Sequence, residues 1–188
     1  MIKAIDLKKV ILIVAAIAIS AGSVNAGPQT LIGLYVDSGH TVCRQDIPVP
    51  YQQFTVWVYV LPGDDGMICA EYRLSAPSWL IIAGTTVNPA HSIALGDNFT
   101  GVTICFAGCQ SDWTWTYQFN MFPMSSGIPD YMNVLPYPNY GLNAYNCLPG
   151  YPIEEMIVLN NLGLNRDCDI TVGTETVSWG AIKNMYGN

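Results

Sequence analysis

Apolar and polar side chains alternate most regularly at residues 113–120. The apolar positions are all aromatic and the positions between them are threonine, glutamine or asparagine: Trp113, Trp115, Tyr117 and Phe119 alternate with Thr114, Thr116, Gln118 and Asn120. A period of two with many aromatic and β-branched residues is typical of a strand that buries one face. We therefore expect a strand here whose four aromatic side chains lie in the core.

Two further stretches alternate differently. In residues 68–74 one side is mostly apolar and the other polar: Ile68, Ala70, Tyr72 and Leu74 against Cys69, Glu71 and Arg73. This predicts a strand with one solvated face. Residues 54–61 are apolar on both sides, because Val56, Val58 and Val60 alternate with Trp57, Tyr59 and Leu61. Such a strand is either central and covered on both faces, or it displays aromatic side chains.

The other strand candidates are short and separated by turns. They are residues 31–36, 79–87, 101–106, 156–160 and 169–172. Residues 62–66, which read Pro-Gly-Asp-Asp-Gly, predict a hairpin loop, and Asn88 with Pro89 predicts a second turn. Short strands about ten residues apart, without long helical periodicity, indicate an all-β sandwich.

Residues 1–26 have the features of a secretory signal peptide. Lys3, Lys8 and Lys9 precede an apolar run at residues 10–19, and small residues then lead to Ala26. A membrane-spanning helix needs about 20 apolar residues, so an uncleaved anchor is the less favoured alternative. We expect cleavage after Ala26, no membrane span afterwards, and a secreted, periplasmic or cell-surface location, in a bacterium.

Loss of the signal peptide makes the chain more acidic. The remainder keeps 4 basic and 13 acidic side chains, a formal charge of 4 − 13 = −9. Four dispersed cations cannot form a phosphate-binding surface, so nucleic acid is excluded as a partner. With 51% hydrophobic and only 11% charged residues, the chain is expected to fold and to suit protein or neutral partners.

We expect one sandwich domain at residues 27–174 with a long loop at residues 122–152. That loop holds six of the 12 prolines and many tyrosines, and long loops of this kind are usually functional or disordered. Residues 175–188 predict a tail with a short helix, in which Ser178 caps a face of Trp179, Ile182 and Tyr186. Because so short a helix is marginal alone, it is expected to dock on the sandwich, a partner or an envelope component.

All six cysteines follow the signal peptide: Cys43, Cys69, Cys105, Cys109, Cys147 and Cys168. An even number in an exported chain favours disulfides over zinc, which needs a second close pair to match Cys105 and Cys109. Many pairings are open to six cysteines. Our expectation joins neighbours along the chain: Cys43 to Cys69, Cys105 to Cys109 and Cys147 to Cys168.

Candidate catalytic chemistry is weak. Nucleophilic catalysis normally pairs serine or cysteine with histidine, but the two histidines, His40 and His91, stand beside turn residues. We therefore expect no catalytic residues and no cofactor. A carboxylate-based hydrolase is the most distant alternative, with Asp37, Glu71 and Asp112 as residues to probe.

Calcium is a further candidate ligand. Asp167 and Asp169 alternate along the chain, and Asp64, Asp65 and Asn165 offer more oxygens. The alternating acidic loop of an EF-hand is absent. The favoured interpretation of Asp167 and Asp169 is a solvated strand edge that resists edge-to-edge pairing.

Aromatic residues provide the best candidates for binding. Exposed rings can serve a protein interface or stack on sugars. Trp57 and Tyr59 would share one strand face, and we combine them with Tyr137 and Tyr140 of the long loop and with Trp179 of the tail. The favoured role is protein binding or self-assembly, and the alternative is a carbohydrate-binding module for neutral polysaccharide.

Residues 66–106 resemble immunoglobulin-like sandwich domains of exported bacterial proteins. The resemblance rests on Ile68-Cys69-Ala70-Glu71-Tyr72-Arg73-Leu74, Trp79-Leu80, Asn88-Pro89 and Gly101-Val102-Thr103-Ile104-Cys105-Phe106. Among such domains, this stretch is similar to cohesin-type modules. Residues 178–186 resemble the ends of uncharacterised secreted proteins of Gram-negative bacteria through Trp179-Gly180, Lys183 and Tyr186. The resemblance implies an immunoglobulin-like antiparallel β-sandwich outside the cytoplasm and does not specify an activity.

Overall fold

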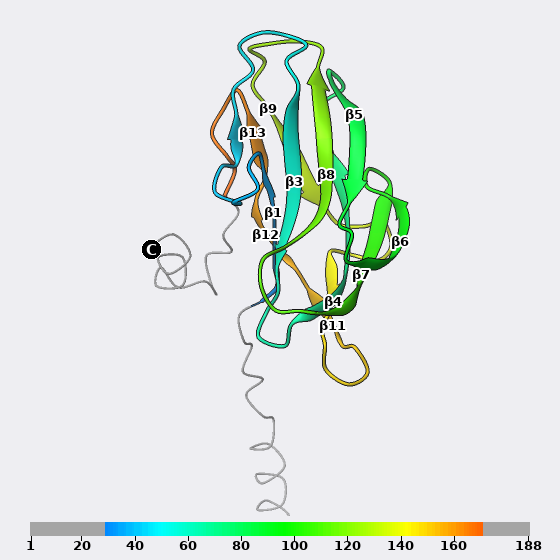
Figure 1. Ribbon diagram of the computed structural model, residues 1–188. Helices are drawn as coiled ribbons and strands as arrows, with labels where there is room; N and C mark the ends of the chain where they lie inside the picture. Colours follow the sequence, from blue (N-terminus) through cyan, green and yellow to red (C-terminus); the bar gives the residue numbers. More distant parts are fainter. Residues whose placement is uncertain (1–28, 171–188) are drawn as a thin grey trace, which may run out of the picture.

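In the computed structural model, which describes residues 29–170, two β-sheets pack face to face (Figure 1). The first has five strands in the order β12 (Ile157–Asn160), β1 (Leu31–Tyr35), β3 (Phe54–Leu61), β8 (Thr114–Pro123) and β5 (Leu80–Val87). The second has eight strands. One run has the order β11 (Ile153–Glu155), β10 (Asn143–Tyr145), β4 (Met67–Ser75), β9 (Asp130–Leu135), β13 (Leu162–Leu164) and β2 (Arg44–Gln45). From β4 the sheet also continues through β7 (Gly101–Gln110) to β6 (His91–Asp97).

The predicted all-β sandwich is confirmed, and the described residues contain no helix. Seven of the strands lie close to predicted stretches, whereas β2, β6, β9, β10, β11 and β13 were not predicted. Most pairs are antiparallel, but β12 pairs with β1 in parallel and so joins the late part of the chain to its first strand.

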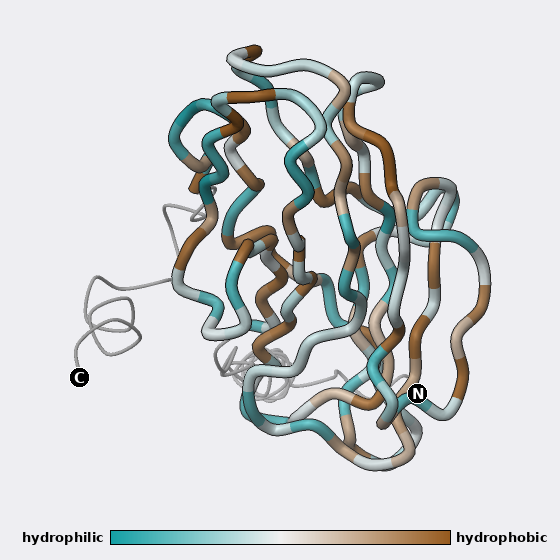
Figure 2. Tube along the Cα trace, turned by 45° about the horizontal axis from the view of Figure 1, so that its top comes forward, coloured by the Kyte–Doolittle hydropathy of each residue, from teal (hydrophilic) through white to brown (hydrophobic). Residues whose placement is uncertain are grey.

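The core lies between the sheets and follows the alternation of the strands, which Figure 2 shows as changing colour along each strand. From β3 it receives Val56, Val58 and Val60, all fully buried. Strand β4 contributes Ala70, Tyr72 and Leu74 as predicted, but an irregularity at its start places Met67 in the core in place of Ile68. Across the core, the Tyr72 hydroxyl and Thr116 Oγ1 lie 2.6 Å apart, a buried hydrogen bond that ties the sheets together.

The prediction that all four aromatics of residues 113–120 lie in the core is half wrong. Tyr117 and Phe119 are buried in the core, whereas Trp113 and Trp115 are half-buried and lie outside it. The cause is an irregular register between β3 and β8, where Val58 pairs with Tyr117 but Tyr59 pairs with Trp115. The extra residue shifts the alternation by one position, so the two tryptophans change sides.

Residues 62–66 form a turn, but the prediction of a hairpin is wrong. The turn closes with a hydrogen bond from Gly66 N to Gly63 O of 3.0 Å, yet the strands on either side, β3 and β4, belong to different sheets. The predicted turn at Asn88 and Pro89 is present, with a hydrogen bond from His91 N to Asn88 O of 3.0 Å, and it also joins strands of different sheets, β5 and β6.

The predicted long loop at residues 122–152 contains two strands, β9 and β10. Met132 and Val134 alternate into the core from β9, which gives this segment a buried face despite its many prolines. Both strands pair with β4, β9 with residues 73–75 and β10 with residues 69–71. They therefore act as one strand interrupted by an insertion at residues 136–142.

All six cysteines form disulfides as expected, but each predicted pairing is wrong. The bonds join Cys43 to Cys168, Cys69 to Cys105 and Cys109 to Cys147. Each joins segments that the sheets bring together: Cys69 faces Cys105 directly across the β4–β7 ladder. Cys105 and Cys109 both lie on β7, and each bonds to a cysteine of a different segment instead of to the other.

Several predictions fall outside the described residues. These are the signal peptide at residues 1–26 and the tail at residues 175–188 with its short helix and Trp179. Of the predicted strand at residues 169–172, the described part is a single bridge between Asp169 and Asn161. Within residues 29–170 no helix is long and apolar enough to cross a membrane.

Candidate functional site

The outer face of the five-stranded sheet carries a cluster of aromatic rings, which we call the aromatic face. It consists of Tyr35 on β1, Trp57 and Tyr59 on β3, and Trp113 and Trp115 at the start of β8, with His40 above them. The Trp57 and Trp115 rings are 5.2 Å apart and almost perpendicular, and Trp57 lies 6.2 Å from Tyr59. The structure thus places Trp57 and Tyr59 on one outward face, as predicted from their spacing.

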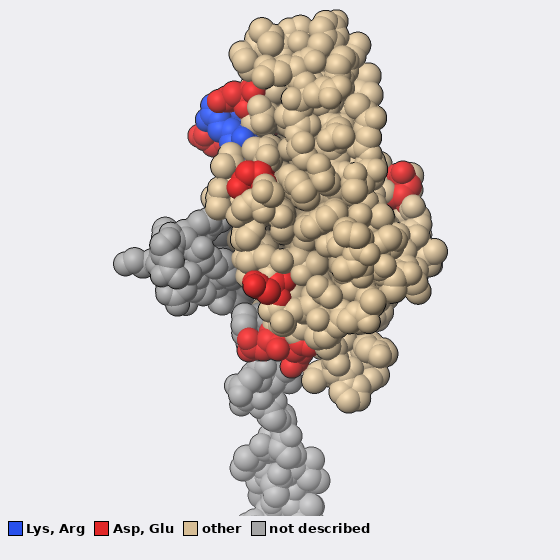
Figure 3. Space-filling view, viewed as in Figure 1, with Lys and Arg blue, Asp and Glu red and all other residues tan. Residues whose placement is uncertain are grey.

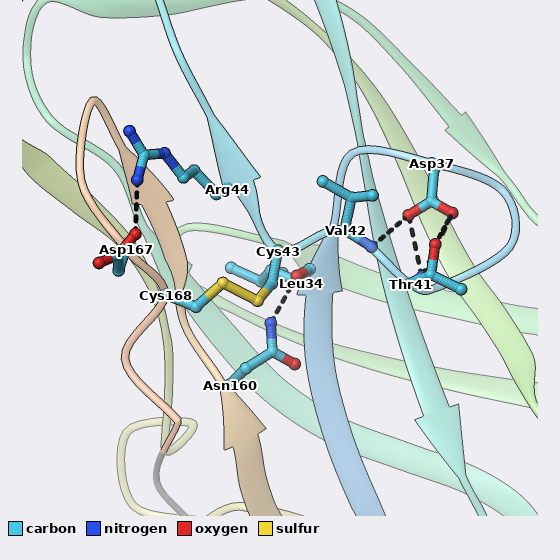
Figure 4. The surroundings of a disulfide bond; sticks show 9 residues. All are labelled: Leu34, Asp37, Thr41, Val42, Cys43, Arg44, Asn160, Asp167 and Cys168. Atoms are coloured by element: carbon cyan, nitrogen blue, oxygen red, sulfur yellow. Dashed lines mark hydrogen bonds and ion pairs between the residues drawn. A yellow bond between two sulfur atoms is a disulfide. The ribbon is translucent and has the colours of Figure 1, made fainter. Parts of the chain in front are cut away.

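A loop at residues 36–42 holds His40 over this cluster. Asp37 organises the loop by accepting hydrogen bonds from Thr41 N at 3.0 Å, Thr41 Oγ1 at 2.9 Å and Val42 N at 2.8 Å (Figure 4). Partial burial alone would raise the pKa of Asp37, but these bonds outweigh burial and lower it. The Tyr59 hydroxyl fastens the loop to β3 by donating to Ser38 O at 2.8 Å.

His40 is part of the aromatic packing. Its ring stacks on Trp113 with centroids 4.3 Å apart, and it lies 5.1 Å from the Tyr59 ring. Burial lowers the pKa of His40 below its usual 6.5, although the nearby carboxylates of Asp37 and Asp112 act in the opposite direction. His40, which the sequence places beside a turn, is therefore half-buried, and it favours the neutral form.

We expect His40 to make stability depend on pH. Because its pKa is lower in the folded state, its stabilising contribution is complete above about pH 6.5 and is lost as the pH falls toward the folded-state pKa. The melting temperature should therefore fall between pH 7.5 and 5.5, and less so in His40→Gln. A proton NMR titration of His40 with a pKa at or above 6.5 would contradict this.

Tyr137 and Tyr140 lie on the second sheet, so they do not join Trp57 and Tyr59 in one platform. They belong to the insertion between β9 and β10, where Tyr140 N donates to Tyr137 O at 3.1 Å. Pro138 and Asn139 fill the central positions of this turn, and Asn139 has a φ of 69°, as the second central residue of a type II turn requires. The Tyr137 ring packs on Gly101 of β7, where a Cβ atom would lie 2.1 Å from the ring.

The outer face of β11, β10, β4, β7 and β6 forms a second candidate surface, which we call the apolar face. Exposed aliphatic side chains lie at its two sides: Ile93 is 49% and Leu95 62% exposed on β6, and Ile153 is 61% exposed on β11. Ile93 pairs with Cys105 and Leu95 with Thr103, so both follow the outward row of β7. The Cys69–Cys105 disulfide links β4 to β7 across the middle.

Glu71 lies at the centre of the apolar face. It is only 7% exposed, and it accepts a hydrogen bond from Thr103 Oγ1 at 3.1 Å. Burial and the neighbouring Glu71 carboxylate raise the pKa of Tyr145 on β10. Tyr140, which is 63% exposed, lies at the same side of the face. Glu155 on β11 and Asp97 on β6 lie in the same outward rows, so this surface combines exposed aliphatic side chains at its two sides with carboxylates and hydroxyl groups.

The structure does not bring the calcium candidates together. The Asp167 side chain is 90% exposed and pairs with Arg44 (Figure 4), and Arg44 also binds Asp46. Asn165 holds the backbone, accepting from Ile47 N at 2.7 Å and donating to Ile128 O at 2.9 Å. Within the described part of the chain, no three His, Cys, Asp or Glu side chains are close enough to hold a metal ion.

The carboxylates considered for hydrolysis lie apart. Glu71 belongs to the apolar face, while Asp37 and Asp112 border the aromatic face. A cavity lined by Gln45, Asp46, Ile47, Gln52, Gln53 and Phe54 has a volume of about 20 Å³, which is room for about one water molecule. The two candidate surfaces are outer faces of the sheets, which suit binding of extended surfaces or chains.

Sheet order, sandwich packing and open faces together define an immunoglobulin-like β-sandwich. No protein-family model and no curated protein matches the sequence. Among solved structures, its fold is similar to that of cohesin modules. One, from a family 33 glycoside hydrolase of Clostridium perfringens, has a TM-score of 0.53 at 10% identity and covers 74% of this chain and 98% of its own.

Two other cohesins show the same likeness. The sixth cohesin of scaffoldin B from Acetivibrio cellulolyticus, solved in complex with a mutant Cel5 dockerin, has a TM-score of 0.51 at 10% identity and covers 74% of this chain and 100% of its own. A non-cellulosomal cohesin from the archaeon Archaeoglobus fulgidus has a TM-score of 0.50 at 12% identity, covering 73% and 90%. At such identities the likeness shows the fold: a β-sandwich of the cohesin type.

Proposed function

We propose that this protein is a non-catalytic binding module that holds a protein partner on its apolar face. The observation that carries the proposal is the exposure of Ile93, Leu95 and Ile153 on one outward sheet surface. Aliphatic side chains exposed on one open face favour an interaction surface, because water contact with them is unfavourable. Glu71 and the tyrosines beside it would fix the orientation of the partner through hydrogen bonds.

Two features support this function and a location outside the cytoplasm. A cohesin of similar fold was solved with a dockerin bound, so the sandwich is compatible with protein binding. Three disulfides use all six cysteines, which is typical of oxidising compartments. Both points agree with the expected signal peptide.

Leu95→Asp tests the proposal. It places a charge at the most exposed apolar side chain of β6 and should weaken partner binding at least about 30-fold while leaving the melting temperature unchanged. The partner is captured from an extract of the source cells on immobilised protein, and affinity is then measured with the purified partner. Self-association, the other form of protein contact, is measured by size-exclusion chromatography with light scattering.

The matched control is Trp57→Ala, which alters the opposite sheet and should leave the partner bound. Partner capture that survives Leu95→Asp, or a protein that neither captures a partner nor self-associates, contradicts the proposal.

A further inference from the structure

The aromatic face carries no charge in any of its strands. The five strands of this sheet contain no Asp, Glu, Lys, Arg or His. Figure 3 shows this face toward the viewer, with acidic and basic side chains at its rim and neutral atoms across its centre. In a protein of net charge −7, an uncharged sheet favours a neutral ligand over an ionic one.

Hydrogen-bonding side chains continue the face beside Trp57. Gln118 on β8 pairs directly with Trp57, and Thr86 on β5 pairs with Gln118, so the three side chains form one row. In the next row Thr55 pairs with Asn120. Asn120 and Thr86 are exposed, and Gln118 and Thr55 are half-buried. Amides and hydroxyls both donate and accept hydrogen bonds, as the hydroxyls of a sugar require.

The two indoles beside this row are held rigidly. The rings of Trp57 and Trp115 are almost perpendicular, at 89°, so a sugar ring that stacks on one indole would contact the other indole with its edge. Beside them on the same face, Tyr59, 6% exposed, packs on Trp57 at 6.2 Å and edge to face with Tyr35, 2% exposed, at 6.0 Å. A ring fixed before binding loses little conformational entropy when a ligand stacks on it.

We propose that the aromatic face binds an uncharged polysaccharide, with sugar rings stacked on Trp57 and Trp115 and hydroxyls bonded to Gln118 and Asn120. The surface is open, so it suits an extended chain that crosses the strands. Asp37 and Asp112 border the cluster and would repel an anionic polysaccharide. This site lies on the sheet opposite the apolar face and does not depend on the protein-binding function.

Affinity electrophoresis of the oxidised full chain tests the inference. Native gels contain hydroxyethyl cellulose, laminarin or galactomannan as neutral polysaccharides, or polygalacturonate as an anionic one. We expect at least one neutral polymer to retard the protein and polygalacturonate to have no effect. Trp57→Ala and Trp115→Ala should each weaken retardation at least about tenfold, and Gln118→Ala about threefold.

Leu95→Asp is the matched control, and the polysaccharides should retard it as they retard the unchanged protein. The experiment thus distinguishes failure of this inference from failure of the protein-binding function. Gln118 is not part of the core, so Gln118→Ala should fold. Its retardation therefore tests the inference if a tryptophan variant does not fold. The inference is overturned if no neutral polymer retards the protein, if Trp57→Ala and Gln118→Ala leave retardation unchanged, or if Trp57→Ala abolishes capture of a protein partner.

Discussion

Replacing both Cys43 and Cys168 by alanine should lower the melting temperature by about 10 to 15 °C. Their disulfide closes a loop of 125 residues, the longest of the three, and so removes the most conformational freedom from the unfolded chain. On the chain-entropy model its loss costs about 4 to 5 kcal/mol. It also fastens the 36–42 loop region to the segment after β13, beside the hydrogen bond from Asn160 Nδ2 to Leu34 O (Figure 4).

The comparison variant replaces Cys109 and Cys147, whose bridge spans only 38 residues. By the same model it should be less destabilising by about 1 kcal/mol. Differential scanning calorimetry of both variants under oxidising conditions provides the measurement. An equal or smaller loss of stability in the Cys43 and Cys168 variant would contradict the assigned role of this bridge.

Phe119→Ala should destabilise the protein by about 4 kcal/mol, whereas Trp115→Ala should cost only about 1 to 2 kcal/mol. Phe119 is 1% exposed between the sheets, and its removal leaves a cavity that the rigid core cannot fill. Trp115 is half-buried on the outer face and leaves no enclosed cavity. Urea unfolding measures both differences in the free energy of unfolding, provided that its dependence on urea concentration is the same in the variants and the unchanged protein.

This pair of variants tests the irregular register of β8 directly. Regular alternation would bury both rings equally, and then Trp115→Ala would cost as much as Phe119→Ala. Similar losses in the two variants would therefore contradict the shifted alternation at Thr116.

Local alternation accounts for what the sequence predicted well. Valines on one side of β3 and aromatics on the other predicted a strand that is either covered on both faces or displays rings, and Trp57 and Tyr59 lie on the outer face of the sheet. The side of β4 that carries Cys69, Glu71 and Arg73 faces outward as predicted, because Ala70, Tyr72 and Leu74 fill the core, but Glu71 on it is only 7% exposed. Such patterns depend only on the period of two in an extended chain.

Features set by distant contacts could not be predicted. The extra residue of β8 is visible only against β3, and the disulfides follow from strand order, which no local pattern contains. The strand with the most exposed aliphatic side chains, β6, was missed because Ser92, Gly96 and Asp97 weaken its pattern. The alternation of Ile93 and Leu95 was the signal that could have indicated it.

The bridge between Cys43 and Cys168 also sets the response of the domain to tension. If force is applied at residues 29 and 170, only residues 29–43 and 168–170 can straighten, about 55 Å of chain at full extension. Without this bridge, but with the other two disulfides intact, the same chain could extend to about 240 Å. Strand β1 lies outside this covalent loop, whereas its parallel partner β12 and the other strands lie inside it, so force bypasses most of the sandwich. In its oxidised form, the domain is a nearly inextensible link between the segments that flank it.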